Sequence, residues 1–196
     1  MSCQRRPIRV EEVKIMSNDA FLPPEYEVPS KAGSYSKFED GDNRFRFLAS
    51  PIIGWVGWKT QPDGGRKPVR KHMNETISVN EVDNEDQIKH FWAMPVYNYR
   101  TDQIEILEIT QKGIQKAIKS LVNDSDWGSP INYDIVINKK GQKLETEYQV
   151  MPKPAKQLDP GIKQAFEDMF INLNALYEGK DPFKEDLADD AVKAGL

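Results

Sequence analysis

The sequence has little cysteine, little histidine and no long apolar run. Of its 196 residues only Cys3 is a cysteine, which excludes an internal disulfide and a cysteine-rich metal site. The two histidines, His72 and His90, have no metal-like spacing with another ligand. The longest apolar run, 47–58, is interrupted by a serine, a proline and two glycines, and falls short of the ~18 residues of a membrane helix. We therefore expect no membrane span, and the absence of an apolar leader predicts a soluble intracellular protein.

Catalytic motifs are also scarce. The sequence contains neither a Gly-x-Ser-x-Gly nucleophile elbow nor a Walker-type phosphate loop, and Gly64 and Gly65 fit a hairpin turn. Residues 178–180 match the Glu-x-Lys pattern of some nucleases, but they follow the end of a predicted helix, where a chance match explains them better. We predict no enzymatic activity, no cofactor and no metal.

The chain divides into four predicted regions. They are an N-terminal arm, a main domain, a C-terminal helix and an acidic tail, at residues 1–30, 31–155, 156–180 and 181–196. The arm mixes charges with four prolines and lacks periodicity. The C-terminal helix is predicted to begin at Pro160, capped by Asp159, and to end at Gly179.

The main domain has the pattern of a small β-barrel. Residues 43–60 are predicted to form one long strand or two collinear ones, with a bend or bulge at Pro51. The later predicted strands, in chain order, are 66–71, 88–99, 103–109, 132–138 and 143–151. Apolar residues on both faces of the strands favour a closed barrel. Thr110 is the predicted N-cap of a helix to about residue 122, with Ile114 and Ile118 on its buried stripe. The predicted fold is mainly β with helices: a five-stranded OB-fold barrel with a helix between strands 3 and 4, plus the C-terminal helix and acidic tail.

Positive charge is concentrated in residues 41–71. This stretch has seven cationic and two acidic side chains, a balance of +5 in a chain of net charge −4, whereas residues 159–196 have a balance of −5. Cations mixed with tryptophans are typical of a groove for single-stranded nucleic acid, where cations neutralise phosphates and bases stack on aromatic rings. A solvated basic hairpin and tryptophans of the core are the competing interpretations, and the residues alone leave them open.

Several short segments, taken together and in order, carry a family resemblance. They include Arg44-Phe-Arg-Phe-Leu48, Pro51-Ile-Ile-Gly-Trp55, Lys89-His-Phe-Trp-Ala93, Ile104-Glu-Ile-Leu-Glu-Ile-Thr110 and Asp126-Trp-Gly128. Over residues 35–155 and 181–183 the chain resembles the replicative single-stranded-DNA-binding proteins of tailed bacteriophages. The resemblance implies an OB-fold that binds single-stranded DNA without sequence preference. Such proteins coat and protect strands exposed in phage DNA replication, recombination and repair.

The resemblance and the charge pattern together imply a set of DNA contacts. The expected phosphate contacts are Arg44, Arg46, Lys59, Arg66, Lys67, Arg70 and Lys71. The expected stacking residues are Trp55, Trp58, Trp92, Tyr97, Tyr99 and Tyr148. Lys139 and Lys140, at a predicted turn, are expected to clamp the strand from the rim. The resemblance also implies the cytoplasm of an infected bacterial host, and contacts of the acidic tail with a phage polymerase, helicase or recombinase.

Two features depart from that family. The T-even phage member of this functional class has a zinc site of Cys and His ligands, which this chain cannot reproduce, so we predict no zinc. The sequence ends in Ala191-Val-Lys-Ala-Gly-Leu196 instead of acids followed by an aromatic residue. Two other functions remain open: a non-enzymatic replisome or virion adaptor on a small β-barrel, and a DNA-processing nuclease. The oligomeric state is left open.

Overall fold

The computed structural model describes residues 35–185 of the chain. The predicted N-terminal arm and most of the predicted acidic tail lie outside the described residues. The strands are β1 (Tyr35–Ser36), β2 (Gly41–Phe47), β3 (Ile52–Thr60), β4 (Arg66–His72), β5 (Lys89–Asn98), β6 (Gln103–Ile109), β7 (Asp134–Lys140) and β8 (Glu147–Pro152). The helices are α1 (Lys112–Asn123) and α2 (Pro160–Glu167), and the short 3-10 turns are η1 (Val79–Glu81), η2 (Glu85–Gln87), η3 (Pro130–Asn132), η4 (Lys143–Glu145) and η5 (Leu173–Leu176). Within this range no helix is both long enough and apolar enough to span a bilayer.

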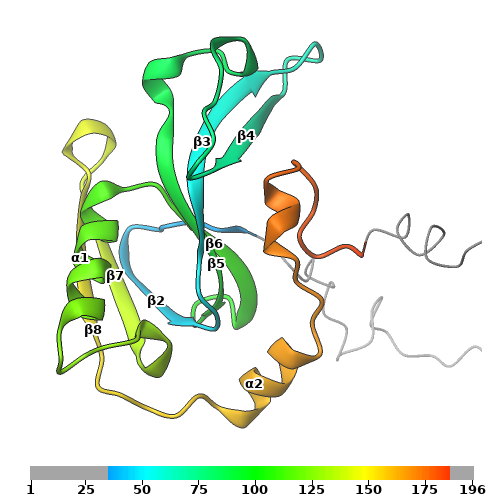
Figure 1. The fold of residues 1–196 in the computed structure, drawn as a ribbon. Coiled ribbons are helices and arrows are strands. Elements are labelled where there is room, and N and C mark those ends of the chain that lie inside the picture. The colour runs from blue at the N-terminus through cyan, green and yellow to red at the C-terminus, as the bar shows by residue number, and fades with distance from the viewer. Residues whose placement is uncertain (1–34, 186–196) are drawn as a thin grey trace, which may run out of the picture. The chain divides into compact units, whose positions relative to one another are not determined.

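The strands form one sheet whose order follows the prediction in part. The hydrogen-bonded order is β1-β6-β5-β2-β7-β8, and β3 pairs with both β5 and β4 (Figure 1). All pairs are antiparallel except β1 with β6. The helix α1 lies between β6 and β7 in the chain, as expected. Among the described residues the sheet has eight strands and is not closed, since β6 and β8 do not pair, so the five-stranded closed barrel is not confirmed.

Of the two arrangements expected for residues 43–60, the structure has two strands. The chain leaves β2 after Phe47 and enters β3 at Ile52, with Pro51 in the break, because proline has no N–H to give to a ladder. The other predicted strands lie within a few residues of the observed ones. Residues 143–145 form the turn η4 instead of extending β8, and α1 is capped by Gln111 instead of Thr110.

The main core fills the inner face of the sheet beneath α1. Phe45, Met94 and Ile135 are buried there together with Ile114 and Ile118 of the helix, which confirms the predicted stripe. At the unclosed edge the Phe38 ring packs edge-on against those of Phe45 and Tyr148, with centroids 6.1 Å and 5.5 Å away. These rings cover the inner face where a barrel would close.

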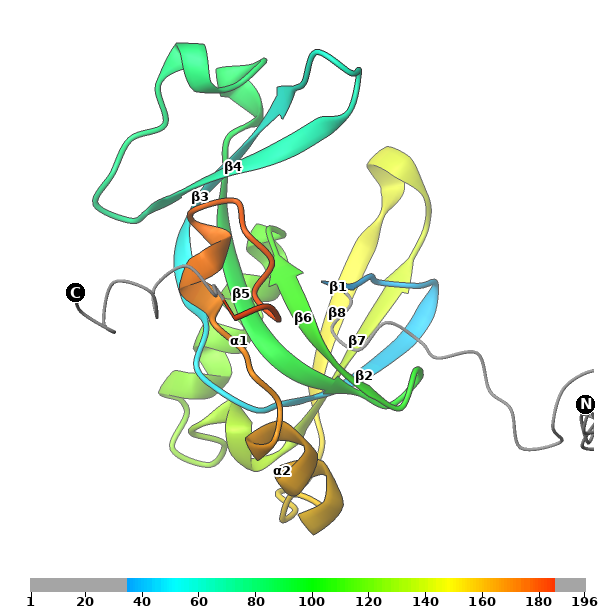
Figure 2. The same ribbon diagram turned by 90° about the vertical axis from the view of Figure 1, so that its right-hand side faces the viewer.

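The C-terminal part of the chain covers the outer face of the sheet. The predicted helix to Gly179 was wrong in length, because α2 ends at Glu167. The segment after α2 turns back along the sheet (Figure 2). There Leu176 of η5 is buried with Val56, Phe91 and other residues of β3, β5 and β6. Burying Leu176 on the sheet requires the chain to turn after α2, and this packing overrides the helical periodicity.

Candidate nucleic-acid interface

The β3–β4 hairpin positions much of the basic stretch. Its strands pair in antiparallel register, so that Trp58 lies opposite Pro68, and residues 61–65 form the predicted turn. Because side chains alternate along a strand, Trp58 faces one side of the hairpin and Trp55 the other. Figures 1 and 2 show this hairpin and the β7–β8 hairpin projecting toward the same side of the sheet.

A groove of about 730 Å³ lies between this hairpin, β1 and the C-terminal segment. We call it the Trp58 groove. Two aromatic side chains are open to solvent there, Trp58 at 39% and Tyr35 at 43% exposure. The residues that line it are Tyr35, Ser36, Lys37, Trp58, Lys67, Pro68, Arg70, Glu108, Gly179, Lys180, Asp181 and Pro182. Four of these carry positive charge and two carry carboxylates, so the groove combines flat rings with a positive balance.

An ion pair forms part of the lining of the groove. The Arg70 guanidinium donates from Nε and Nη2 to Oε2 of Glu108, over 3.0 Å and 2.7 Å. Only 6% of the Arg70 side chain is exposed, and its guanidinium also lies 5.8 Å from the Phe91 ring centroid. Arg70 is therefore held in place by Glu108, and its predicted role as a phosphate contact requires a phosphate to compete with this carboxylate.

The other cations of the hairpin differ in their exposure. Arg66 and Lys67 are exposed, and the Arg66 guanidinium lies 5.8 Å from the Trp58 ring centroid. Lys59 is half-buried. Lys71 pairs with Glu81 over 3.0 Å, and this hydrogen bond raises the pKa of Lys71. Arg66 and Lys67 are thus the hairpin cations best placed to meet a phosphate.

The loop after β4 is hydrogen-bonded to β3 of the hairpin through Asp83. The Asp83 carboxylate accepts hydrogen bonds from the N–H (2.9 Å and 3.0 Å) and the hydroxyl (2.7 Å) of Thr60, and these bonds lower its pKa. The Asp83 N–H donates to the Trp58 carbonyl over 2.9 Å. A Cβ on Gly57 would come within 2.4 Å of Val82, so the loop packs directly on the backbone of β3. This contact supports the strand that carries Trp58.

A second group of predicted residues surrounds Asp134, at the other end of β5. Arg44 is exposed on its side chain by 45%, pairs with Asp134 and lies 4.4 Å from the Tyr99 ring centroid. Arg46 is only 1% exposed, pairs with Asp134 over 3.1 Å, and donates to the carbonyls of Ile131 and Lys156. Burial and the ion pair with Asp134 make Arg46 a structural residue in this conformation, whereas Arg44 remains accessible.

The two predicted tyrosines adjoin this group. The Tyr97 and Tyr99 rings meet edge-on with centroids 5.0 Å apart. The Tyr97 hydroxyl donates to Asp102, and this bond raises the pKa of Tyr97 to about 12. Tyr99 is 37% exposed and donates to Asp134 over 3.1 Å. Both rings are therefore oriented by acids, and neither lines the Trp58 groove.

Two predicted tryptophans lie on the other face of the sheet. The Trp55 and His90 rings meet with centroids 5.6 Å apart, and the His90 and Trp92 rings follow at 6.5 Å. Both tryptophans are half-buried, and Trp92 packs against the main core. The structure therefore separates Trp55 and Trp92 from Trp58.

The β7–β8 hairpin carries the remaining predicted residues. Lys140 is exposed at its tip, whereas Lys139 pairs with Asp40 over 2.9 Å, which raises the pKa of Lys139. Tyr148 is half-buried against Phe38. Of these three predicted residues, Lys140 is the one exposed to solvent.

The chain is similar in sequence to one curated phage protein. The chain is 26% identical over 140 residues to a protein of Escherichia phage T5 named as a probable ssDNA-binding protein. The match covers 67% of this chain and 48% of that protein, so the chain spans about half the length of the curated relative it matches. No family model matches the chain, and no solved structure matches it.

Sequence reasoning missed several residues of the Trp58 groove. Tyr35 and Lys37 lie in and beside the two-residue strand β1, which is too short to leave a periodic signal. Glu108 was part of a motif but not a predicted contact, because its meeting with Arg70 joins residues far apart in the chain. The acidic residues near Asp181 were the feature of the sequence from which a position of the C-terminal segment near a basic surface could have been predicted.

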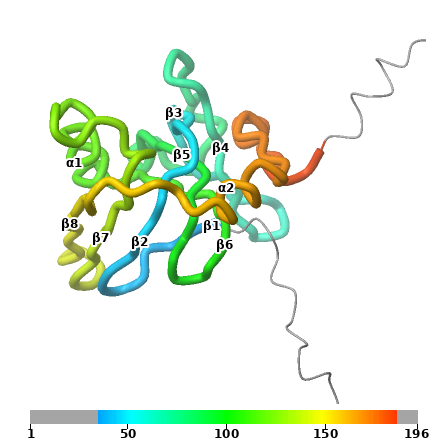
Figure 3. The backbone as a smooth tube through the Cα atoms, turned by 90° about the horizontal axis from the view of Figure 1, so that it is seen from below, coloured from blue at the N-terminus to red at the C-terminus, as the bar shows by residue number. Residues whose placement is uncertain are grey.

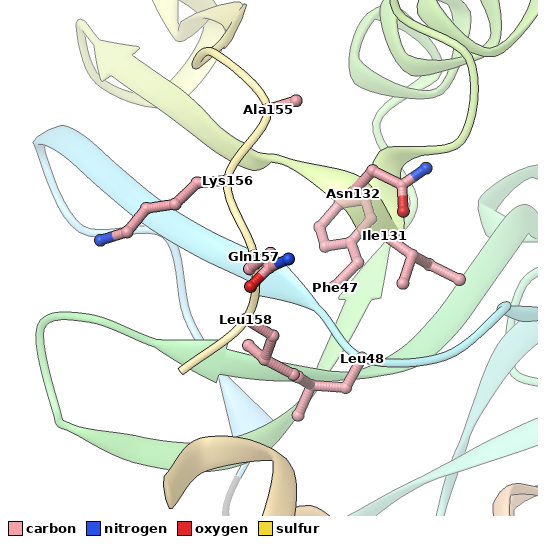
Figure 4. A pocket seen from close by; sticks show the side chains of 8 residues that line it. All are labelled: Phe47, Leu48, Ile131, Asn132, Ala155, Lys156, Gln157 and Leu158. Carbon is pink, nitrogen blue, oxygen red and sulfur yellow. The ribbon is translucent and has the colours of Figure 1, made fainter. Parts of the chain in front are cut away.

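A second hollow lies beneath the connection from β8 to α2. Figure 3 shows this connection passing β2 on its way to α2. Within the connection, the backbone N–H groups of Lys153 and Lys156 donate to the backbone carbonyls of residues 134 and 132. It leaves a pocket of about 440 Å³ between Phe47, Ile131 and Leu158 (Figure 4). Lys156 is the one cation among its lining residues, against four in the Trp58 groove, so this pocket offers less positive charge to a phosphate chain. Elsewhere in residues 35–185, no group of three or more ligating side chains is placed to hold a metal.

Proposed function

We propose that the chain binds single-stranded DNA along the Trp58 groove, largely without regard to sequence, and so coats and protects strands during phage DNA replication, recombination and repair. The observation that carries the proposal is the exposure of Trp58 and Tyr35 within one groove lined by Lys37 and Lys67. The similarity to a probable ssDNA-binding protein of phage T5 supports it. The proposal includes no enzymatic step.

The mechanism follows from the two kinds of side chain. Trp58 and Tyr35 offer flat faces to unstacked bases, and each base stacked on an aromatic ring contributes about 1–3 kcal/mol. Lys37, Arg66 and Lys67 neutralise phosphates, and each phosphate contact on a single strand steepens the salt dependence by about 0.7. Lys59 and Lys140 extend the proposed path, whereas Arg46 is left out because it is buried and paired.

The order of elements supports the finer fold assignment within this proposal. The strands β2, β5, β6, β7 and β8, with α1 before β7, follow the order of an OB-fold, and β3–β4 is an insertion after the first of them. OB-folds bind oligonucleotides on the outer face of their second and third strands, which correspond to β5 and β6 here. The Trp58 groove adjoins this face through Glu108 of β6.

The C-terminal segment gives the acidic tail its proposed role. Residues 179–182 line the groove, so Asp181 brings a negative charge to it. We propose that the tail that follows competes with DNA at low salt, and that it is available to a polymerase, helicase or recombinase when DNA occupies the groove. The host cytoplasm is the compartment in which these contacts would occur.

A binding titration tests the function. We expect a labelled oligo-dT of about 30 nucleotides to bind with a salt-dependent affinity, and the matching duplex to bind far more weakly. The double substitution Arg66→Glu and Lys67→Glu should weaken binding equally for all sequences and flatten the salt slope by about 1 to 2. The matched control is Lys116→Glu with Lys119→Glu, two exposed lysines of α1. Unchanged affinity in the hairpin variant would remove the groove from the interface, and no binding to any single strand would overturn the function.

A further inference from the structure

A separate, smaller pocket lies on the other side of Trp58. Its volume is about 230 Å³, and its lining residues are Val56, Trp58, Arg66, Gln87, Lys89, Glu108 and Thr110. We call it the Glu108 pocket. Trp58 and Glu108 line both this pocket and the Trp58 groove, so they separate the two hollows. The volume equals that of about eight waters at ~30 Å³ each, which leaves room for a flat base.

The pocket combines two exposed cations, Arg66 and Lys89, with the carboxylate that it shares with the groove. That carboxylate, Glu108, accepts hydrogen bonds and has no hydrogen to donate. Both Arg70 bonds end on Oε2 of Glu108, so within the described residues Oε1 is the oxygen that Arg70 leaves for a ligand. The same two bonds hold the carboxylate in one orientation, which reduces the ordering cost of binding.

We propose that the Glu108 pocket takes one base of the bound strand, stacked on Trp58, and favours a base that carries an exocyclic amino group. This inference rests on the proposed function and adds a preference at one nucleotide to it. An acidic side chain accepts a hydrogen bond from the amino group of cytosine. Uracil and thymine place a carbonyl oxygen where cytosine has that amino group, so the carboxylate meets a second acceptor there and loses the hydrogen bond that the amino group donates. Cytosine is the smallest base of the favoured class.

Single-base changes in the DNA provide the first test. The probe is a short oligo-dU strand, compared with the same strand carrying one dC near its centre. This pair differs at position 4 and at the adjacent N3, which carries a hydrogen in uracil and not in cytosine, and it avoids the methyl group of thymine. We expect the dC strand to bind about tenfold more tightly, as for one hydrogen bond to a charged group. A strand with 2-pyrimidinone at that place, which lacks the amino group, should lose the gain.

A substitution of the carboxylate provides the second test. Glu108→Gln keeps one oxygen to accept from Arg70 and puts an amide N–H₂ donor in place of Oε1. We expect the preference to reverse, because the new donor pairs with the carbonyl of uracil and not with the amino group of cytosine. The matched control is Glu167→Gln on α2, which should keep the preference for dC. If Glu108→Gln does not fold, the 2-pyrimidinone strand tests the inference on the unchanged protein.

The outcomes separate this inference from the proposed function. Tight binding of both strands with equal affinity overturns the base pocket and leaves single-strand binding intact. The base pocket is also overturned if folded Glu108→Gln still prefers the dC strand, or if the 2-pyrimidinone strand binds as tightly as the dC strand. Failure to bind any of the strands overturns both proposals. A preference for dC that is lost with 2-pyrimidinone and reversed in Glu108→Gln supports the pocket.

Discussion

Removal of the Trp58 ring is the sharpest single test of the interface. The indole is 39% exposed and touches the two hollows on either side of it, so it contributes to binding more than to the core. One lost base stack is worth about 1–3 kcal/mol, which corresponds to about 5- to 150-fold in affinity. We therefore expect Trp58→Ala to weaken binding of oligo-dT by at least about fivefold. Its effect on stability should be smaller than the ~3–5 kcal/mol of a buried tryptophan.

Fluorescence separates this loss from a general disturbance. The chain has four tryptophans, so quenching by DNA reports whichever of them stacks. Trp58→Phe keeps a ring for stacking and should keep most of the affinity while losing most of the quenching. Trp127→Phe, a half-buried ring packed on Tyr133, is the control and should keep both. If folded Trp58→Ala binds oligo-dT within twofold of the unchanged protein, the reasoning that places the bases on Trp58 is refuted.

Three further changes test other parts of the structure. Asp134→Asn leaves Arg46 buried without its charged partner, so it should lower the free energy of unfolding, measured in urea, by about 3–5 kcal/mol. A loss as small as that of the exposed control Asp168→Asn would contradict this. The pKa of Asp83 is lower in the folded protein than its ordinary value, so its hydrogen bonds stabilise the fold at pH values above that ordinary pKa. This stabilisation is lost as the pH falls through the lower pKa of the folded state. The difference in Tm between the unchanged protein and Asp83→Asn should therefore shrink below about pH 4, and a constant difference would count against that role. Truncation after residue 185 removes three aspartates and should tighten DNA binding at low salt only, whereas equal affinity would exclude competition by the tail.

Local patterns predicted the strands and α1 well, because their signals are short-range. Alternation and turn residues mark the β3–β4 and β5–β6 hairpins, and the helical spacing of Ile114 and Ile118 marks α1. The end of α2 was not predictable in this way. Its apolar spacing continues beyond Glu167, and only the packing of Leu176 on a sheet that is distant in sequence ends the helix.

The candidate interface shows the same limit more strongly, because charge is visible in a sequence and pairing is not. Arg46 and Arg66 are equivalent as letters in a basic stretch, yet one is 1% exposed against Asp134 and the other lies in solvent beside Trp58. What separates them is the identity of the facing strand: β7 brings an acid to Arg46, whereas β4 is a hairpin edge with no further strand beside it among the described residues. A basic segment therefore predicts that a phosphate surface is present. The acids contributed by other strands decide which of its cations remain available to phosphate. Here the available cations are those at the edge of the β3–β4 hairpin.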